Sequence, residues 1–156
     1  NLNRPPALEA IPAAALFDEL CAMRQTRLDE KALRLEIDAR ADLQLRADRF
    51  LLRQALLNLL DNAIDFSPVH GLIQLGCRQV GDRIEIRLRD HGAGVPAYAQ
   101  ARLFERFYST PRPDSGQRGT GLGLNLVEQV ARLHGGDIAL RNHPDGGADA
   151  VLGLPV

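Results

Sequence analysis

The chain has 156 residues, of which 45% are apolar and 25% charged, a composition that predicts one globular domain with a substantial core. Its formal net charge is −1, so it lacks the summed basic field that attracts nucleic acid or an anionic membrane surface. No apolar stretch approaches the roughly 20 residues that cross a bilayer. Cys21 and Cys77 form no metal or redox motif, and Lys31, the only lysine, follows no glycine-rich loop, which excludes a Walker A site.

The spacing of apolar residues predicts helices that alternate with strands, without an internal repeat. Residues 1–12 are interpreted as a linker and residues 13–156 as one domain. We expect helices at 13–31, 48–66 and 122–134, a short helical piece at 97–103, and strands at 33–37, 43–45, 72–80, 83–90, 138–142 and 148–154. Gly81 and Asp82 suit the tight turn of an antiparallel hairpin. Alternating strands bury one face, so we expect a sheet covered by helices mainly on one side.

The helix expected over 48–66 carries polar residues beside a broad apolar surface. Asp48 suits its N-cap, and apolar residues cover roughly 200° of its circumference. Asn58 and Asn62 lie one turn apart at the edge of that arc, and Asp65 continues the stripe. A buried amide without a partner costs about 1–3 kcal/mol, so the pair suggests a polar ligand, and an amide oxygen can also bind Mg2+. The alternative is that both amides bind nearby backbone or face water.

The strand expected over 83–90 ends on a carboxylate in an apolar position. Apolar residues alternate along it as far as Leu88, and the same alternation puts Asp90 on their face. Gly92 and Gly94 follow and allow a ligand to approach the backbone closely. A carboxylate at the bottom of an apolar pocket suits an exocyclic amine such as adenine N6. The alternative is a strand-end Asp that caps a turn.

Three glycines at alternate positions, Gly119, Gly121 and Gly123, lie at the start of the helix expected over 122–134 or just before it. They can turn backbone N–H groups toward one point, next to the unpaired N–H groups of the first helical turn. This arrangement predicts a phosphate site, although a flexible loop with helix-packing glycines has the same pattern. Together with the asparagine pair and Asp90, the glycine pattern predicts a site for one nucleotide, bound through its metal, its phosphates and its base.

Four segments in order resemble the motif boxes of the histidine kinase catalytic domain: NLLDNAIDFSP the N box, DHGAGVP the G1 box, LFERFYS the F box and GTGLGL the G2 box. The chain is identified on these motifs as a member of the superfamily that includes gyrase, Hsp90 and MutL ATPases, and it is most similar to sensor kinases of the Cre type, linked to carbon-source response. The resemblance implies an α+β fold, a two-layer α/β sandwich of the Bergerat ATP-binding type. Its sheet would be mixed and mainly antiparallel, with helices packed on one face.

The resemblance also implies ATP and Mg2+ as cofactors, with Asn62 as the metal ligand and Asn58 and Asn62 as catalytic residues beside the phosphates. Asp90 would bind adenine N6 and Phe66 would pack near the base. Residues 97–118 would form the ATP lid, anchored by packing of Phe104 and Phe107. The implied cofactor-binding residues are Asn58, Asn62, Asp65, Phe66, Asp90, Gly92, Gly94, Val95, Arg118, Gly119, Thr120, Gly121, Leu122, Gly123 and Leu124.

The chain departs from the family pattern at Asp65, where the family often has a Lys or Arg that contacts phosphate. We hypothesise that Arg118 supplies the missing cation, with Arg106 and Arg112 as alternatives.

The residue type at position 58 bears on the reaction. Related hydrolases have a Glu at the position of Asn58, because an attacking water must lose a proton. Neutral imidazole already has a lone pair and needs no such base, so Asn58 favours transfer of the γ-phosphoryl group to a histidine. The alternatives are an ATP hydrolase or serine kinase of the same superfamily, or a non-catalytic nucleotide-sensing module, which Asp65 leaves open.

None of the four histidines, His70, His91, His134 and His143, has the His-Glu or His-Asp context of the family's phosphoacceptor helix. The expected partners are therefore the dimerisation and histidine phosphotransfer domain of the same parent protein, of whose link residues 1–12 would be the remnant, and a cognate response regulator. The chain is expected to be the cytoplasmic domain of a bacterial inner-membrane sensor protein. No contact of its own with membrane or nucleic acid is expected.

Overall fold

The computed structural model describes residues 4–40, 42–106, 108 and 123–156. Its main feature is a five-stranded sheet with the order β2-β4-β5-β7-β6. The strands are β2 (Arg34–Asp38), β4 (Leu72–Val80), β5 (Arg83–Asp90), β6 (Asp137–Asn142) and β7 (Ala148–Pro155). β2 and β4 are parallel, and the other neighbouring pairs are antiparallel.

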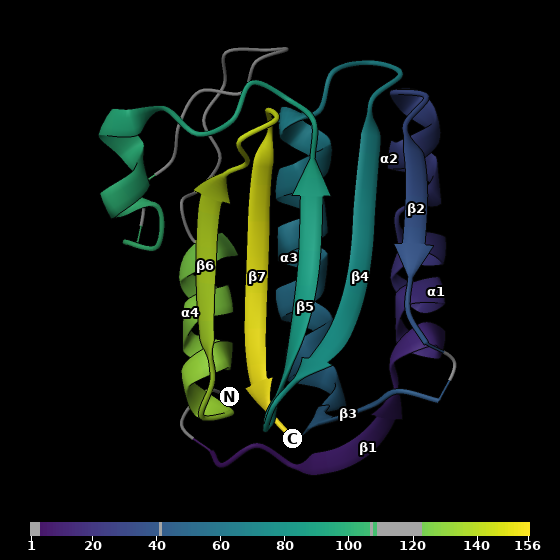
Figure 1. Ribbon diagram of the computed structural model, residues 1–156, viewed down its shortest axis with the longest axis vertical. Coiled ribbons are helices and arrows are strands. Elements are labelled where there is room, and N and C mark those ends of the chain that lie inside the picture. The colour runs from purple at the N-terminus through teal and green to yellow at the C-terminus, as the bar shows by residue number, and fades with distance from the viewer. Residues whose placement is uncertain (1–3, 41, 107, 109–122) are drawn as a thin grey trace.

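Helices cover one face of this sheet (Figure 1). They are α1 (Ala13–Met23), α2 (Gln25–Glu30), α3 (Arg49–Phe66) and α4 (Gly123–Leu133). The α+β class, the two layers and the mixed, mainly antiparallel sheet that the sequence predicted are all confirmed. In the described part of the chain, none of the helices is apolar over the length that a bilayer requires.

The core lies between α3 and the inner face of the sheet. Leu52, Leu56 and Leu60 of α3 are fully buried, as the broad apolar arc of this helix predicted. Ile86 and Leu88 of β5 point into the same core and are 1% and 3% exposed. The helix that bears the asparagine stripe is therefore fixed directly against the strand that ends at Asp90.

The β4–β5 hairpin has the predicted bounds and the predicted antiparallel pairing. Gly81 in its turn has φ +63°, a conformation that glycine adopts at little cost. The predicted short helical piece is a 3-10 helix, η1 (Ala97–Arg102). The hairpin matters for the site because its register carries Asp90 to the end of the sheet.

Two local features differ from the sequence-based expectation. Leu8–Pro12, expected within a linker, forms strand β1, which pairs with β3 (Gln44–Asp48) in a separate two-stranded sheet. The single helix expected over 13–31 is divided at Arg24 into α1 and α2. Both features involve partners distant in sequence: β1 pairs with β3, and the Arg24 guanidinium binds Asp61 of α3.

Asp48 joins the start of α3 to its surroundings. As predicted, it is the N-cap: Oδ1 accepts from the Leu51 N–H at 3.0 Å, while Oδ2 accepts from the Ala7 N–H at 2.9 Å. Its own N–H lies 3.0 Å from Nε2 of His134, whose Nδ1 lies 2.8 Å from the Val130 carbonyl oxygen. This bond requires an acceptor at Nε2, so His134 has its proton on Nδ1 and ties the end of α4 to the start of α3.

Replacing Asp48 by alanine is expected to lower the free energy of unfolding by about 1–2 kcal/mol at pH 7, because the cap of α3 is lost. Burial pushes the pKa of Asp48 upward, but the Leu51 and Ala7 amides favour the carboxylate and leave the pKa below its ordinary value of 3.8. A lowered pKa stabilises the fold above pH 3.8, and this stabilisation is lost as the pH falls through the folded-state value. Urea denaturation at pH 7 and at about pH 3 should therefore give a smaller difference between wild type and Asp48→Ala in acid. An equal difference at both pH values would contradict the assignment.

Candidate functional site

Asp90 is a buried carboxylate at the end of β5. Its side chain lies on the same face as Ile86 and Leu88 and is 4% exposed, so the predicted misplaced carboxylate is confirmed. Oδ1 accepts hydrogen bonds from the backbone N–H groups of Gly92, at 3.0 Å, and Ala148, at 3.2 Å. Within the part of the chain that the structure describes, Oδ2 has no hydrogen-bond partner, so this oxygen is available to a ligand.

Burial raises the pKa of Asp90 above its ordinary value, because the charged form loses its contact with water. The Gly92 and Ala148 amides and the nearby His91 and Arg89 side chains act in the opposite direction but do not cancel the effect of burial. A carboxylate kept in an apolar environment at a cost is a good candidate for a functional group.

Asn58 and Asn62 lie on the side of α3 that is only partly buried. Asn58 Nδ2 donates to the Gly123 carbonyl oxygen at 3.2 Å, which links α3 to the first residue of α4. Among the described residues, the Asn62 amide has no hydrogen bond. The structure thus brings the N box and the start of α4 together, and it leaves the Asn62 amide oxygen available one turn away.

The acidic residues of α3 face α2. Asp61 binds Arg24 at 2.6 Å and Arg27 at 2.8 Å, and the second guanidinium nitrogen of Arg27 binds Asp65 at 2.5 Å. Lys31 Nζ donates to the Ile64 carbonyl oxygen at 2.8 Å. Asp65 is therefore held by a cation of a neighbouring helix. Its predicted role at the nucleotide stays a prediction.

Two glycines of the G1 segment pack closely against the protein itself. A Cβ at Gly92 would overlap the carbonyl oxygen of Phe66, the last residue of α3. A Cβ at Gly94, which has φ +82°, would lie 2.7 Å from Oδ1 of Asn142. In the structure these glycines allow close packing against α3 and the end of β6. Their predicted role in shaping a ligand site stays a prediction.

The first turn of α4 begins at Gly123 and Leu124, the last two predicted phosphate-site residues. Leu124 packs against the core, and Asn125 Nδ2 donates to the Phe104 carbonyl oxygen at 3.1 Å, so α4 also holds the F-box residue that was predicted to anchor the lid. The predicted residues Arg118, Gly119, Thr120, Gly121 and Leu122 lie outside the described residues, as do Phe107 and Arg112. The alternative cation Arg106 is described and exposed.

Sequence reasoning missed Ala148 and Asn142, which hold Asp90 and the G1 segment. Ala148 acts through its backbone N–H, for which no residue type is diagnostic. Asn142 precedes the HPDGG turn and had no periodic or motif signal that pointed to a partner 47 residues earlier. The pairing of β6 and β7 sets Asn142 opposite Ala148, so that Ala148 reaches Asp90 and Asn142 reaches Val95.

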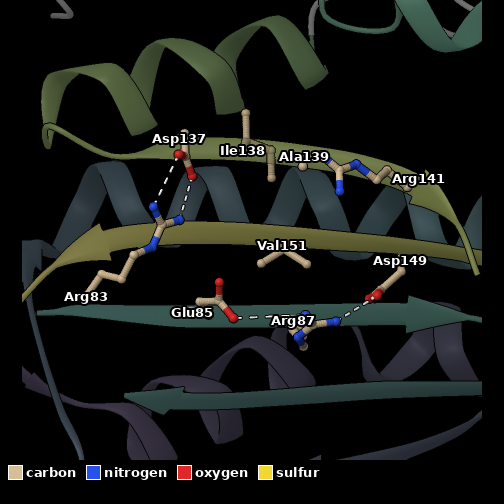
Figure 2. Close-up of a pocket in the computed structure, with 9 residues that line it drawn as sticks. All are labelled: Arg83, Glu85, Arg87, Asp137, Ile138, Ala139, Arg141, Asp149 and Val151. Carbon is tan, nitrogen blue, oxygen red and sulfur yellow. Dashed lines mark hydrogen bonds and ion pairs between the residues drawn. The ribbon is translucent and has the colours of Figure 1, made fainter. Parts of the chain in front are cut away.

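A separate cavity of about 540 Å³ lies on the other face of the sheet, lined by residues of β5, β6 and β7. Figure 2 shows that ion pairs cross between strands there, from Arg83 to Asp137 at 2.7 Å and from Arg87 to Asp149 at 2.8 Å. Arg83 and Arg87 alternate along β5 with residues that face the core. Because Asp90 is on the core side, this cavity is distinct from the predicted nucleotide site.

The described residues carry little potential for redox chemistry and no multi-ligand metal cluster. Both cysteines are unpaired, and burial, together with the charge of Asp38, raises the pKa of Cys77 to about 11, so that it remains a thiol at neutral pH. In the described part of the chain, no group of three or more His, Cys, Asp or Glu side chains is arranged to hold a metal ion. Mg2+ needs no such group, because it commonly binds through one or two protein oxygens together with phosphates and waters. The Asn62 amide oxygen fits that requirement.

Comparisons with known proteins identify the family of this domain. A sequence profile described as histidine kinase-, DNA gyrase B- and HSP90-like ATPase matches residues 47–156. Sensor protein CreC of Escherichia coli (strain K12) is 44% identical over 147 residues, which are 94% of this chain and 31% of CreC. The structure of the mycobacterial sensor histidine kinase MprB has a TM-score of 0.80 at 28% identity and covers 96% of this chain and 97% of that one.

The catalytic domain of histidine kinase ThkA shares the fold, with a TM-score of 0.83 at 23% identity over 95% of this chain and 97% of its own. The structure of ThkA has also been solved in complex with response regulator protein TrrA. The ThkA chain of that complex has a TM-score of 0.77 at 20% identity, and the match covers 95% of this chain and 41% of the ThkA chain.

The chain belongs to the family of histidine kinase-, DNA gyrase B- and HSP90-like ATPases, as an ATP-binding catalytic domain of the sensor histidine kinase type. The predicted resemblance to Cre-type sensor kinases is confirmed by the similarity to CreC. The chain spans about a third of the length of that relative, 31%.

Replacing Gly92 by alanine is expected to destabilise the domain by about 1–3 kcal/mol, because the new methyl group overlaps the Phe66 carbonyl and either α3 or the G1 segment must move. Affinity for ADP should fall as well. Urea denaturation and calorimetric titration measure the two effects. Gly123→Ala is the matched control for stability, since its Cβ would lie no closer than 3.9 Å to Asn58. Equal stability of Gly92→Ala and wild type would refute this packing argument.

Proposed function

We propose that this domain binds ATP with Mg2+ and transfers the γ-phosphoryl group to a histidine on a separate helical domain of the same parent protein. The phosphoryl group then passes to an aspartate of a response regulator. The observation that carries the proposal is the Asp90 carboxylate, buried at the end of β5 with Oδ1 held by two backbone amides and Oδ2 left available.

Asp90 distinguishes adenine from guanine by the direction of its hydrogen bond. An ionised carboxylate only accepts, so Oδ2 pairs with a donor such as the N6 amine of adenine and repels the O6 carbonyl of guanine. The Gly92 and Ala148 amides keep Oδ1 fixed, which sets the position of Oδ2 before the base arrives. Preorganisation of this kind raises affinity because less freedom is lost on binding.

The phosphates are assigned to the place where α3 meets the start of α4. The Asn58–Gly123 hydrogen bond holds these helices together there. The first N–H groups of α4 have no partner within the helix and carry partial positive charge, which favours an anion. Asn62 provides the metal ligand, and Arg118 is proposed as the cation that replaces the one absent at position 65. Bound Mg2+ would neutralise charge on the β- and γ-phosphates.

The acceptor chemistry follows from the residue at position 58. A neutral imidazole nitrogen attacks the γ-phosphorus with its own lone pair, a P–N bond forms, and the bond to the ADP oxygen breaks. No side chain has to remove a proton before the attack, so Asn58 rather than a carboxylate suffices. The domain contributes positioning and charge neutralisation to this transfer.

The remaining parts of the proposal concern the longer protein. The chain covers 31% of CreC, so the histidine-bearing helices and the response regulator are partners that other segments and other chains would supply. We place this domain on the cytoplasmic side of a bacterial inner-membrane sensor. The residues that precede β1 would lead from the dimerisation and phosphoacceptor region into it.

Replacing Asp90 by asparagine tests recognition of the base. The asparagine oxygen would take over the bonds from Gly92 and Ala148, and its NH2 group would then face the N6 amine as a second donor. ADP affinity should fall about 10- to 100-fold, as expected for loss of a charged hydrogen bond, and the preference for ADP over GDP should narrow. Calorimetric titration with each nucleotide gives both numbers. An unchanged ADP affinity with an unchanged preference would contradict the base contact.

Mixing the domain with ATP, Mg2+ and separately produced histidine-bearing helices of the parent protein tests the reaction. We expect acid-labile phosphohistidine on the helices and ADP in equal amount. Release of free phosphate without phosphohistidine would instead indicate a hydrolase. Tight nucleotide binding with neither product would indicate a nucleotide-sensing module.

A further inference from the structure

Asn142, the last residue of β6, forms a two-sided contact with the G1 segment. Its Oδ1 accepts from the Val95 N–H at 2.6 Å, and its Nδ2 donates to the Val95 carbonyl oxygen at 2.9 Å. One side-chain amide thus satisfies both backbone groups of one residue, as a neighbouring strand would. Val95 follows directly after the glycines of the G1 segment and precedes η1.

The backbone of the G1 segment is shaped to admit this contact. Gly94 has φ +82°, a conformation that residues with a side chain rarely adopt. A Cβ at Gly94 would also lie 2.7 Å from the Asn142 oxygen. The glycine therefore lets the chain turn toward Asn142 and leaves space for its amide.

The turn that follows Asn142 holds the other end of the same segment. The His143 N–H donates to the Gly147 carbonyl oxygen at 2.9 Å, which closes the β6–β7 turn. Gly147 packs so closely on the backbone of Asp90 that a Cβ there would overlap it, and the next residue, Ala148, binds Asp90 Oδ1. The β6–β7 hairpin thus binds both ends of the segment 90–95. Ala148 binds Asp90 at one end, and Asn142 binds Val95 at the other.

We propose that Asn142 is a positioning residue for nucleotide binding, which holds the Gly94–Val95 backbone in its binding-competent form before the nucleotide arrives. This inference rests on the proposed function. When only a fraction of molecules has the competent conformation, the apparent affinity falls by that fraction. Asn142 and both of its hydrogen bonds to Val95 are exposed, so its removal should affect the loop far more than the core.

The test compares Asn142→Ala with Arg141→Ala, an exposed neighbour on β6 outside the site. Asn142→Ala should weaken ADP binding about tenfold, which is about 1.4 kcal/mol, while the thermal midpoint changes little. Arg141→Ala should bind ADP as wild type does. Calorimetric titration and thermal unfolding supply these values.

Hydrogen exchange supplies a readout that a general structural role would not change. In the nucleotide-free wild-type domain the Val95 amide should already be protected, and in Asn142→Ala it should exchange at the rate of an open loop while amides of α3 remain protected. An unprotected Val95 amide in the wild type, or an ADP affinity of Asn142→Ala equal to that of the wild type, overturns the inference. If the wild type itself binds no ADP, the proposed function fails instead.

Discussion

The burial of one carboxylate is the constraint on which the rest of the site depends. Asp90 occupies a position on β5 where the alternation of the strand requires an apolar residue, and burial raises its pKa. The fold offsets this cost with two backbone amides, from Gly92 and Ala148, that bind one oxygen of the carboxylate. These amides come from different segments, so the turn after β5 and the start of β7 must both be in place for the carboxylate to be tolerated.

The helix α3 connects this carboxylate to the rest of the site. Its apolar arc packs on the inner face of the sheet, and its last carbonyl group, at Phe66, lies against Gly92. Its partly buried side presents Asn58 to the first residue of α4 and leaves Asn62 with no partner among the described residues. One rigid element thus fixes the distance between the end that would hold a base and the end that would hold phosphates, which suits a ligand with both groups.

The charges around α3 show how neighbouring helices modify a local sequence. Asp61 and Asp65 would place two negative charges on one side of α3, close to a proposed phosphate site. Arg24 and Arg27 bind them from the turn between α1 and α2 and from α2. These groups are about a quarter to two-fifths exposed, and pairs of this kind contribute little to stability, about 1 kcal/mol or less each. They place positive charge beside the acidic side of α3, which would reduce the repulsion of an anion at the neighbouring asparagines.

The sequence by itself determined the periodic elements: the hairpin bounds, the capped helix with its broad apolar arc, and the phase that puts Asp90 toward the core. These follow from local rules, since strand alternation and helical spacing depend only on neighbouring residues. Only the tertiary structure decided which groups meet: Gly92 with Phe66, Asn142 with Val95, and the Asp90 carboxylate with the Ala148 amide. Such contacts join residues 26 to 58 positions apart, and strand order and helix packing, which no local pattern encodes, bring them together.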